Sequence, residues 1–373
     1  MISLEEEQKP VIQQKGDYGV VAITKHGVEI ARKLGHSFQN ADVYYMSKFE
    51  KGDEQEKDIQ MFTGSVRLLL PSLFESYKGL IIIISLGAVV RMISPLLKDK
   101  KTDPAVVVID DIGEHVISVL SGHIGGANEL SREVAAALHA RPIITTASDV
   151  QQTIPVDLFG KRYGWVWESA EKLTPVSAAV VNEEKIAVVQ ESGEKEWWHY
   201  GRPLPENIKV YPSVAEALLQ EPAAALVVTH RNLVKEENPI LHNGVLYRPK
   251  VIVLGMGCNR DTSAEEIEAV INETLEELHF SRKSIKALCT IDLKKDEAGL
   301  IEVVNKNGWE FVCYSPSELN AVKIEDPSET VYKYTGAYGV SEPAALIYSG
   351  AEKLELVKKK SGNVTISVAI KQY

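Results

Sequence analysis

One glycine-rich segment of the chain brings together residues that could carry acid–base chemistry. Residues 121–128 (SGHIGGAN) are predicted to join a strand to a helix. Histidine titrates near neutral pH and is the commonest general base, and backbone N–H groups at a helix start can stabilise an oxyanion or bind a carboxylate. We therefore predict that His123 is catalytic and that Ser121, Gly125 and Gly126 bind substrate. A capped glycine-rich turn with a surface histidine is the alternative.

Acidic residues occur close to this segment. Glu114 follows Asp110 and Asp111 in a turn between two predicted strands, and a hairpin there could fold Glu114 back towards His123 as a second catalytic group. For Asp110 and Asp111 a solvated turn is the favoured interpretation. His115 lies on a separate element from His123, unlike the closely spaced ligands of zinc sites, so we predict no protein-held metal.

An arginine follows the most apolar strand of the N-terminal part. Residues 81–84 are four consecutive isoleucines, and Gly87 and Arg91 come directly after them. Arg91 should therefore lie at the carboxyl edge of the sheet, where open α/β sheets bind ligands. We predict that Gly87 and Arg91 bind substrate, with Arg91 holding a carboxylate through two hydrogen bonds; a structural ion pair is the alternative.

The C-terminal third contains two further glycine-rich junctions. Gly255 and Gly257 follow a strand predicted at 251–254, and glycines there let backbone N–H groups approach an anion. The dinucleotide fingerprint is incomplete, so a tight turn without a ligand is the alternative. Gly339 and Ser341 lead into another helix, where Ser341 as an N-cap and Glu342 as a helix-dipole partner is the simpler interpretation. We predict that these glycines and Ser341 bind substrate and that Glu342 is catalytic.

The elements that position these residues indicate three α/β domains. A chain of 373 residues is too long to fold around one ordinary hydrophobic core. Residues 1–149 alternate short β-branched runs with helical patterns, which is typical of a Rossmann-like parallel sheet with crossover helices. Residues 150–249 are predicted to form a small middle domain that ends in a polar linker at 231–249. Residues 250–373 are predicted to form a C-terminal α/β domain closed by a hairpin.

Composition limits the function and the location. The net charge of −11 argues against nucleic-acid binding. Three scattered cysteines favour a reducing compartment. The first seven residues (MISLEEE) lack the features of a secretory signal, and Arg91 and Pro95 interrupt the apolar run at 80–97, which we interpret as a strand followed by a helix and not a membrane span. We expect a cytoplasmic protein.

These motifs in combination resemble the cobalamin-biosynthesis G protein family. The N-terminal motifs are residues 85–91 (SLGAVVR), 108–110 (VID) and 120–130 (LSGHIGGANEL). The C-terminal motifs are 255–258 (GMGC), 290–292 (TID) with Lys294 and 297–300 (EAGL), and 339–345 (GVSEPAA). The C-terminal part also resembles a small stand-alone cobalamin protein of the aerobic pathway. The middle part matches in position more than in motif.

The resemblance implies a cobalt-precorrin-5A hydrolase of anaerobic cobalamin (vitamin B12) biosynthesis. In that reaction water opens a lactone of the corrin ring, and a retro-aldol-type step releases acetaldehyde and gives cobalt-precorrin-5B. The implied substrate is an anionic cobalt-corrinoid that carries its own cobalt, so no separate cofactor is expected. Transient contact with other enzymes of the pathway is also expected.

No catalytic residues are carried over from the family, so the roles are hypotheses. His123 would activate water, Gly125 and Gly126 would hold the oxyanion, and Glu114 or Glu342 would move the alcohol proton. The substrate is expected between the first and third domains. A non-catalytic tetrapyrrole carrier of the same pathway is the main alternative, and a nucleotide-dependent oxidoreductase is a weaker one.

Overall fold

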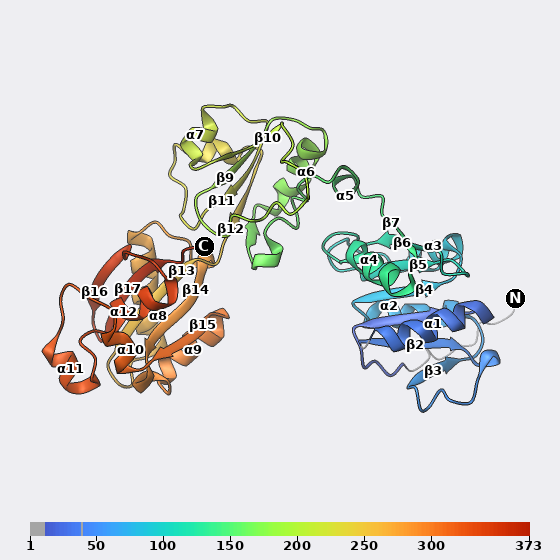
Figure 1. The fold of residues 1–373 in the computed structure, drawn as a ribbon, viewed down its shortest axis with the longest axis horizontal. Helices are drawn as coiled ribbons and strands as arrows, with labels where there is room; N and C mark the ends of the chain where they lie inside the picture. The colour runs from blue at the N-terminus through green and yellow to red at the C-terminus, as the bar shows by residue number, and fades with distance from the viewer. Residues whose placement is uncertain (1–11, 39) are drawn as a thin grey trace, which may run out of the picture. The chain divides into compact units, whose positions relative to one another are not determined.

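The structure, a computed structural model, describes residues 12–38 and 40–373. The acidic segment 1–7, on which the predicted lack of a secretory signal depended, lies outside these residues. The chain divides into two compact units, Met1–Gln152 and Thr153–Tyr373. One sheet lies in the first unit and two lie in the second (Figure 1). All three sheets contain parallel strands connected through helices, which confirms the predicted α/β class.

A seven-stranded, mostly parallel sheet forms the first unit. Its elements are β1 (Tyr18–Ala22), α1 (Lys25–Ser37), β2 (Ala41–Met46), β3 (Ile59–Phe62), α2 (Val66–Ser76), β4 (Gly79–Ile83), α3 (Leu86–Ile93), β5 (Ala105–Ile109), β6 (His115–Leu120), α4 (Ala127–Leu138), β7 (Arg141–Ile143) and α5 (Ala147–Gln151). The strand order is β3-β2-β1-β4-β5-β6-β7. Helices α1 and α4 cover one face of the sheet, and α2 and α3 cover the other.

The direction of β6 decides where the loops of this unit lie. Strands β1 to β5 are parallel to one another, but β6 runs antiparallel to β5, and β7 follows the direction of β6. The carboxyl ends of β6 and β7 therefore lie at the edge opposite the carboxyl ends of β1, β4 and β5. Loops that follow β4 and β6 belong to different edges of the sheet.

The apolar run at 80–97 forms β4 and α3, as predicted. All five residues of β4 are buried, as expected for a central strand covered on both faces. Gly87, predicted to bind substrate, lies inside α3, because the helix already begins at Leu86. No helix within the described residues is long and apolar enough to cross a membrane.

The second unit begins with a five-stranded middle sheet. Its elements are β8 (Val166–Glu168), α6 (Leu173–Val181), β9 (Ile186–Gln190), β10 (Ile208–Tyr211), α7 (Val214–Leu218), β11 (Ala224–Val228) and β12 (Gly244–Arg248). The predicted linker at 231–249 is wrong, because β12 is fully buried between β11 and β8. The segment is polar because residues such as Arg231 and Glu237 form ion pairs before this short strand begins.

The second sheet of this unit is a five-stranded C-terminal sheet. Its elements are β13 (Ile252–Cys258), α8 (Ala264–Glu277), β14 (Ile285–Ile291), α9 (Ala298–Asn307), β15 (Glu310–Tyr314), α10 (Pro316–Asn320), α11 (Glu329–Thr335), α12 (Ser341–Ser349), β16 (Leu356–Ser361) and β17 (Val364–Ile370). The order is β15-β14-β13-β17-β16, and the antiparallel pair β16–β17 confirms the predicted closing hairpin.

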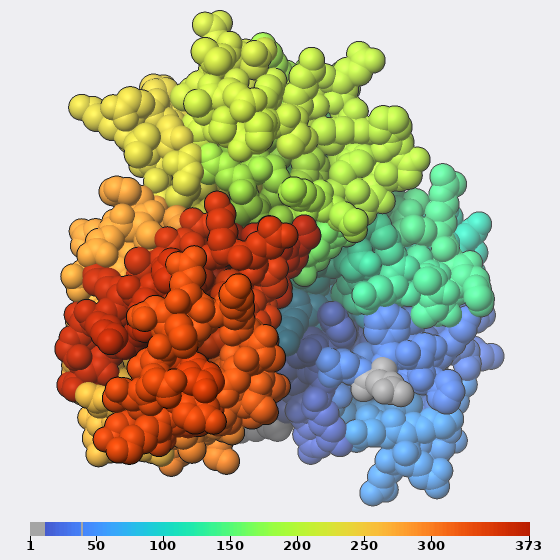
Figure 2. Space-filling model, turned by 60° about the vertical axis from the view of Figure 1, so that its left-hand side comes forward, coloured from blue at the N-terminus to red at the C-terminus, as the bar shows by residue number. Residues whose placement is uncertain are grey.

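The two faces of the C-terminal sheet carry different helices. Residues of α8 and α9 pack on one face, and residues of α10 and α12 pack on the other. In the space-filling view the orange and red part of the chain, which includes α11, α12 and the β16–β17 hairpin, is seen at the lower left (Figure 2).

Candidate functional site

A cleft of about 600 Å³ opens at the carboxyl ends of β13 and β14 in the C-terminal domain. Its walls come from these strand ends, from α11, from the start of α12 and from the β16–β17 hairpin. The cleft occupies the edge of the sheet where ligands bind in open α/β folds. Four residues predicted from sequence line it, namely Gly257, Gly339, Ser341 and Glu342.

Gly255 was predicted to lie in a glycine-rich turn that could bind an anion. In the structure it has a packing role instead. Both Gly255 and Gly257 lie within β13, which continues to Cys258, so the prediction of a loop there is wrong. A Cβ atom on Gly255 would lie 1.8 Å from the carbonyl oxygen of Ser341. The glycine therefore allows the start of α12 to lie directly on β13, which positions Ser341 and Glu342.

We expect Gly255→Ala to destabilise the second unit by about 2 to 3 kcal/mol, because the added methyl group would force α12 away from the sheet. Gly257→Ala is the matched control, since its Cβ would meet nothing closer than 3.8 Å. Denaturant unfolding followed by tryptophan fluorescence reports this unit, because all five tryptophans lie between residues 165 and 309. Equal unfolding midpoints for the two variants would contradict this packing role.

Glu342 is a buried carboxyl group in the wall of the cleft. It is only 3% exposed, and its Oε2 lies 3.7 Å from Nζ of Lys358. Burial raises the pKa of Glu342, and the nearby Lys358 ammonium only partly opposes this effect. A carboxyl group that keeps its proton closer to neutral pH can act as a general acid or base.

Ser341 supports this part of the cleft. Its hydroxyl lies 2.9 Å from the hydroxyl of Ser367 on β17, and both side chains are buried. The alternative interpretation of Ser341 as an N-cap is wrong, because the helix already includes Ser341 and the cap position falls to Val340.

The cations of the cleft were missed by sequence reasoning. Arg260, Lys294, Lys358 and Lys360 all line it. Lys294 pairs with Glu297 (Nζ–Oε2 2.9 Å), and although burial opposes it, this contact holds the pKa of Glu297 below its usual range. Lys358 and Lys360 lie on β16, the first strand of the closing hairpin, which continues to Ser361. The alternation of a strand, extended to these residues, would have placed Lys358 and Lys360 on one side.

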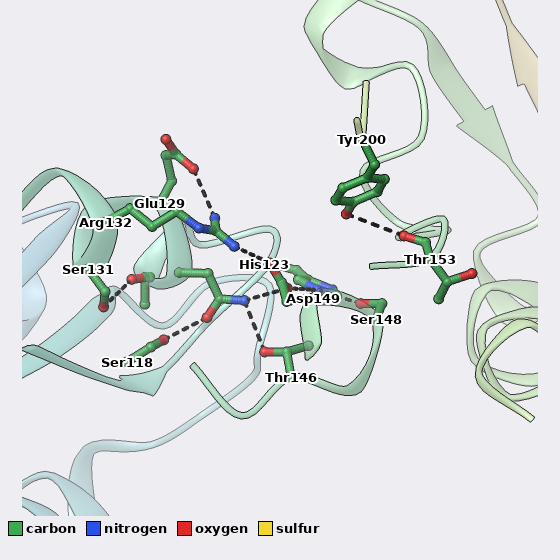
Figure 3. Close-up of polar contacts among 12 residues, drawn as sticks. Ser118, His123, Glu129, Ser131, Arg132, Thr146, Ser148, Asp149, Thr153 and Tyr200 are labelled. Atoms are coloured by element: carbon green, nitrogen blue, oxygen red, sulfur yellow. Dashed lines mark hydrogen bonds and ion pairs between the residues drawn. The ribbon is translucent and has the colours of Figure 1, made fainter. Parts of the chain in front are cut away.

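His123 lies in the first unit, in the loop after β6, and is held by Asp149 (Figure 3). Its Nε2 lies 3.0 Å from Oδ2 of Asp149 and 3.1 Å from Oγ of Ser148. The imidazole is 19% exposed, so it is not the surface histidine of the alternative interpretation. A carboxylate at Nε2 fixes the orientation and the tautomer of the ring.

Asp149 joins the other groups around His123. It accepts hydrogen bonds from Asn128 (Nδ2–Oδ2 2.9 Å) and from the guanidinium of Arg132. Burial opposes ionisation, but the hydrogen bonds from His123 and Arg132 outweigh it and lower the pKa of Asp149. Sequence reasoning missed Asp149 because the preceding strand, β7, has only three residues.

The amide groups of this loop are largely used within the loop. The N–H of Gly126 donates to the carbonyl of His123, and the N–H of Ala127 donates to the carbonyl of Ser121. Gly125 is required by close packing, since a Cβ atom there would lie 2.3 Å from that of Ser121. The Gly126 amide predicted to hold an oxyanion is therefore already bonded.

The remaining predicted residues lie at the other edge of the first sheet. Glu114 is exposed in the turn before β6, whereas His123 follows β6, and the strand separates them by about 20 Å. The predicted approach of Glu114 to His123 is wrong, because the hairpin runs away from that loop. Arg91 is exposed near the Glu114 edge and donates to the carbonyl of Gly87 within its own helix (Nη1–O 2.9 Å).

The histidines and carboxylates of the described residues do not gather into a cluster of three or more that could hold a metal ion. Asp110 accepts hydrogen bonds from the backbone N–H groups of Ile112, Glu114 and His115, so it shapes the predicted turn, and Asp111 in the same turn is exposed.

Comparisons with known proteins cover most of the chain. Three family models match, described as cobalamin synthesis G N-terminal (residues 69–149), cobalamin biosynthesis central region (154–249) and cobalamin synthesis G C-terminus (252–369). The chain is 78% identical over 373 residues, the whole of both proteins, to a protein from Priestia megaterium named cobalt-precorrin-5A hydrolase.

Two further matches extend these findings. The protein named CobE from Sinorhizobium sp is 31% identical over 121 residues, which are 32% of this chain and 79% of that protein. A crystal structure of a cobalamin biosynthesis protein G homolog from Sulfolobus solfataricus is 24% identical, with a TM-score of 0.36, and the match covers 95% of this chain and 97% of that one. The full-length identity and the three matched regions show that this chain belongs to the cobalamin synthesis G family.

Proposed function

We propose that this protein is a cobalt-precorrin-5A hydrolase that opens the lactone of its substrate and releases acetaldehyde. The observation that carries the proposal is the 78% identity, over the full length of both chains, with a relative of that name. The substrate is an anionic cobalt-corrinoid, and the product is cobalt-precorrin-5B.

The reaction requires proton transfer at two stages. Water first attacks the lactone carbonyl, and the ring C–O bond breaks to give a carboxylate and an alcohol. The alcohol then loses its proton, the adjacent C–C bond breaks, acetaldehyde leaves, and the electron pair stays on the macrocycle until a proton is taken up. Glu342 suits these transfers because it is buried in the cleft wall and its pKa is raised.

His123 is proposed as the group that activates the water. Asp149 orients its ring through Nε2, which is the arrangement that general bases commonly need. The cobalt arrives already bound within the substrate, so the proposal includes no cofactor of the protein's own. We also propose a cytoplasmic location, where the three free cysteines would stay reduced, and transient contacts with other pathway enzymes.

We expect anaerobic incubation with cobalt-precorrin-5A to release one acetaldehyde per macrocycle without added nucleotide or metal. Acetaldehyde can be assayed enzymatically while the corrin mass is followed by mass spectrometry. Heat-unfolded protein is the control. If folded protein binds the macrocycle and returns it unchanged, the hydrolase proposal fails and the alternative of a tetrapyrrole carrier is supported.

A further inference from the structure

The cleft of the C-terminal domain contains positive charge that the proposed proton transfers do not use. Among the residues that the structure describes, four basic side chains and one acidic side chain, that of Glu342, line the cleft. The chain as a whole has a net charge of −11. Cations gathered in one cleft of an acidic protein indicate an anionic ligand.

Two of these four cations are already neutralised by neighbours. Arg260 pairs with Asp296 (Nη1–Oδ1 2.7 Å), and Lys294 pairs with the buried Glu297. Their positive charge therefore offsets carboxylates of the protein and is less available to a ligand.

The other two cations are Lys358 and Lys360 on β16. Nζ of Lys358 forms two long ion pairs, 3.7 Å from a carboxylate oxygen of Asp326 and 3.7 Å from one of Glu342, and both distances exceed that of a hydrogen bond. Lys360 forms no ion pair with any residue in the described part of the chain. Both ammonium groups can therefore donate hydrogen bonds to a ligand.

Exposed apolar side chains lie in the same cleft. Leu293, in the turn after β14, is 48% exposed, and Tyr334, on α11, is 76% exposed. Together they give the cleft an apolar surface beside its cations, against which a flat ring could pack. Cations next to apolar surface suit a ligand that combines a broad ring with carboxylates at its rim.

We propose that Lys358 and Lys360 bind carboxylate side chains at the rim of the corrin ring, while Leu293 and Tyr334 pack against the ring. The inference rests on the proposed function for the nature of the ligand, a polycarboxylate tetrapyrrole. The two lysines lie two residues apart on one strand, about 7 Å between Cα atoms, so each can bind a different carboxylate. Because Lys358 lies beside Glu342, this binding mode brings the ring next to the proton-transfer group.

The first test compares Lys360→Met with Lys359→Met in the full-length protein. Methionine keeps an unbranched apolar chain and removes the charge. Lys359 is the matched control because its Nζ pairs with Glu277 (2.7 Å) and Glu273 (3.1 Å) instead of entering the cleft. We expect Lys360→Met to raise KM for cobalt-precorrin-5A about tenfold with little change in kcat, since it removes binding shared by ground and transition states.

The second test measures binding without turnover. Uroporphyrin, a fluorescent tetrapyrrole with two carboxylates on every pyrrole ring, is titrated into wild type and both variants, and coproporphyrin, with half as many carboxylates, serves for comparison. We expect Lys360→Met to weaken uroporphyrin binding about tenfold, Lys359→Met to leave the Kd unchanged, and wild type to bind coproporphyrin more weakly.

The two tests separate this inference from the proposed function. Lysine-dependent porphyrin binding without acetaldehyde release would support the binding site and refute the hydrolase. Normal acetaldehyde release together with a wild-type KM for Lys360→Met would overturn the binding site and keep the hydrolase. Equal porphyrin affinities for all three proteins, or no porphyrin binding by any of them, would also overturn it.

Discussion

Replacing Glu342 by glutamine is expected to lower kcat for cobalt-precorrin-5A by about a hundredfold or more, the usual effect of losing a general acid or base. Glutamine has nearly the same volume, so the buried site should keep its packing and the protein should remain folded. The substitution removes a titrating group of which only 3% is exposed. Acetaldehyde release at saturating substrate measures the effect, and far-ultraviolet circular dichroism checks the fold.

The raised pKa of Glu342 predicts the direction in which kcat changes with pH. Burial raises the pKa of Glu342, so its protonated form persists to higher pH than for an ordinary glutamate. If Glu342 donates a proton in the slow step, kcat of the wild type falls as pH rises through that raised pKa. Glutamine does not titrate, so the remaining activity of the variant should not show this fall of kcat at high pH, the falling limb of the pH profile.

Asp326→Asn is the matched control for Glu342→Gln. Asp326 also lies 3.7 Å from Lys358, but its side chain is 87% exposed. Its negative charge contributes to the raised pKa of Glu342, so removing it should move the falling limb slightly to lower pH and leave the maximal kcat nearly unchanged. If Glu342→Gln keeps the wild-type kcat and an unaltered pH profile, Glu342 takes no part in proton transfer.

Two of the elements that build the C-terminal cleft, β13 and α12, could be predicted from the sequence, because their patterns are local, whereas α11 and the cations of β16 were not predicted. The glycines before α12 and the strand that becomes β13 were recognised, and Gly257, Gly339 and Glu342 do share one cleft. The packing role of Gly255 could not be predicted from the sequence. Its neighbour Ser341 is 86 positions away, and only the packed fold brings the two residues together.

The N-terminal prediction failed where strand direction mattered. A hairpin around the turn at Asp110 was predicted, and β5 and β6 do form it, but its effect on the position of Glu114 was predicted wrongly. An antiparallel strand in a parallel sheet sends its following loop to the opposite edge, so Glu114 and Arg91 cannot join His123. Asp149, the residue that does contact His123, follows a strand too short to give a pattern.

The secondary structure of the middle domain was the hardest to predict, again because short strands give little sequence pattern. The buried strand β12 is only five residues long and follows a polar segment, so average composition indicated a linker. Its partners, β11 and β8, lie far from each other in the sequence. Pairing of this kind is a tertiary property, and periodicity within one short segment does not reveal it.

His123 is proposed to be catalytic, and its contact with Asp149 also gives it an anchoring role. Alanine at this position is expected to lower turnover about a hundredfold or more, as for loss of a general base. The fold should survive, because Asp149 keeps its hydrogen bonds from Asn128 and Arg132.

His123→Gln separates the two roles, because the glutamine amide can still donate a hydrogen bond to Asp149 but cannot accept a proton near neutral pH. If His123 is the base, the glutamine variant should be as slow as the alanine variant at saturating substrate, while its thermal unfolding midpoint stays at the wild-type value. If the glutamine variant turns over cobalt-precorrin-5A at the wild-type rate, His123 serves only to hold Asp149 and the short helix α5, and the water must be activated by another group.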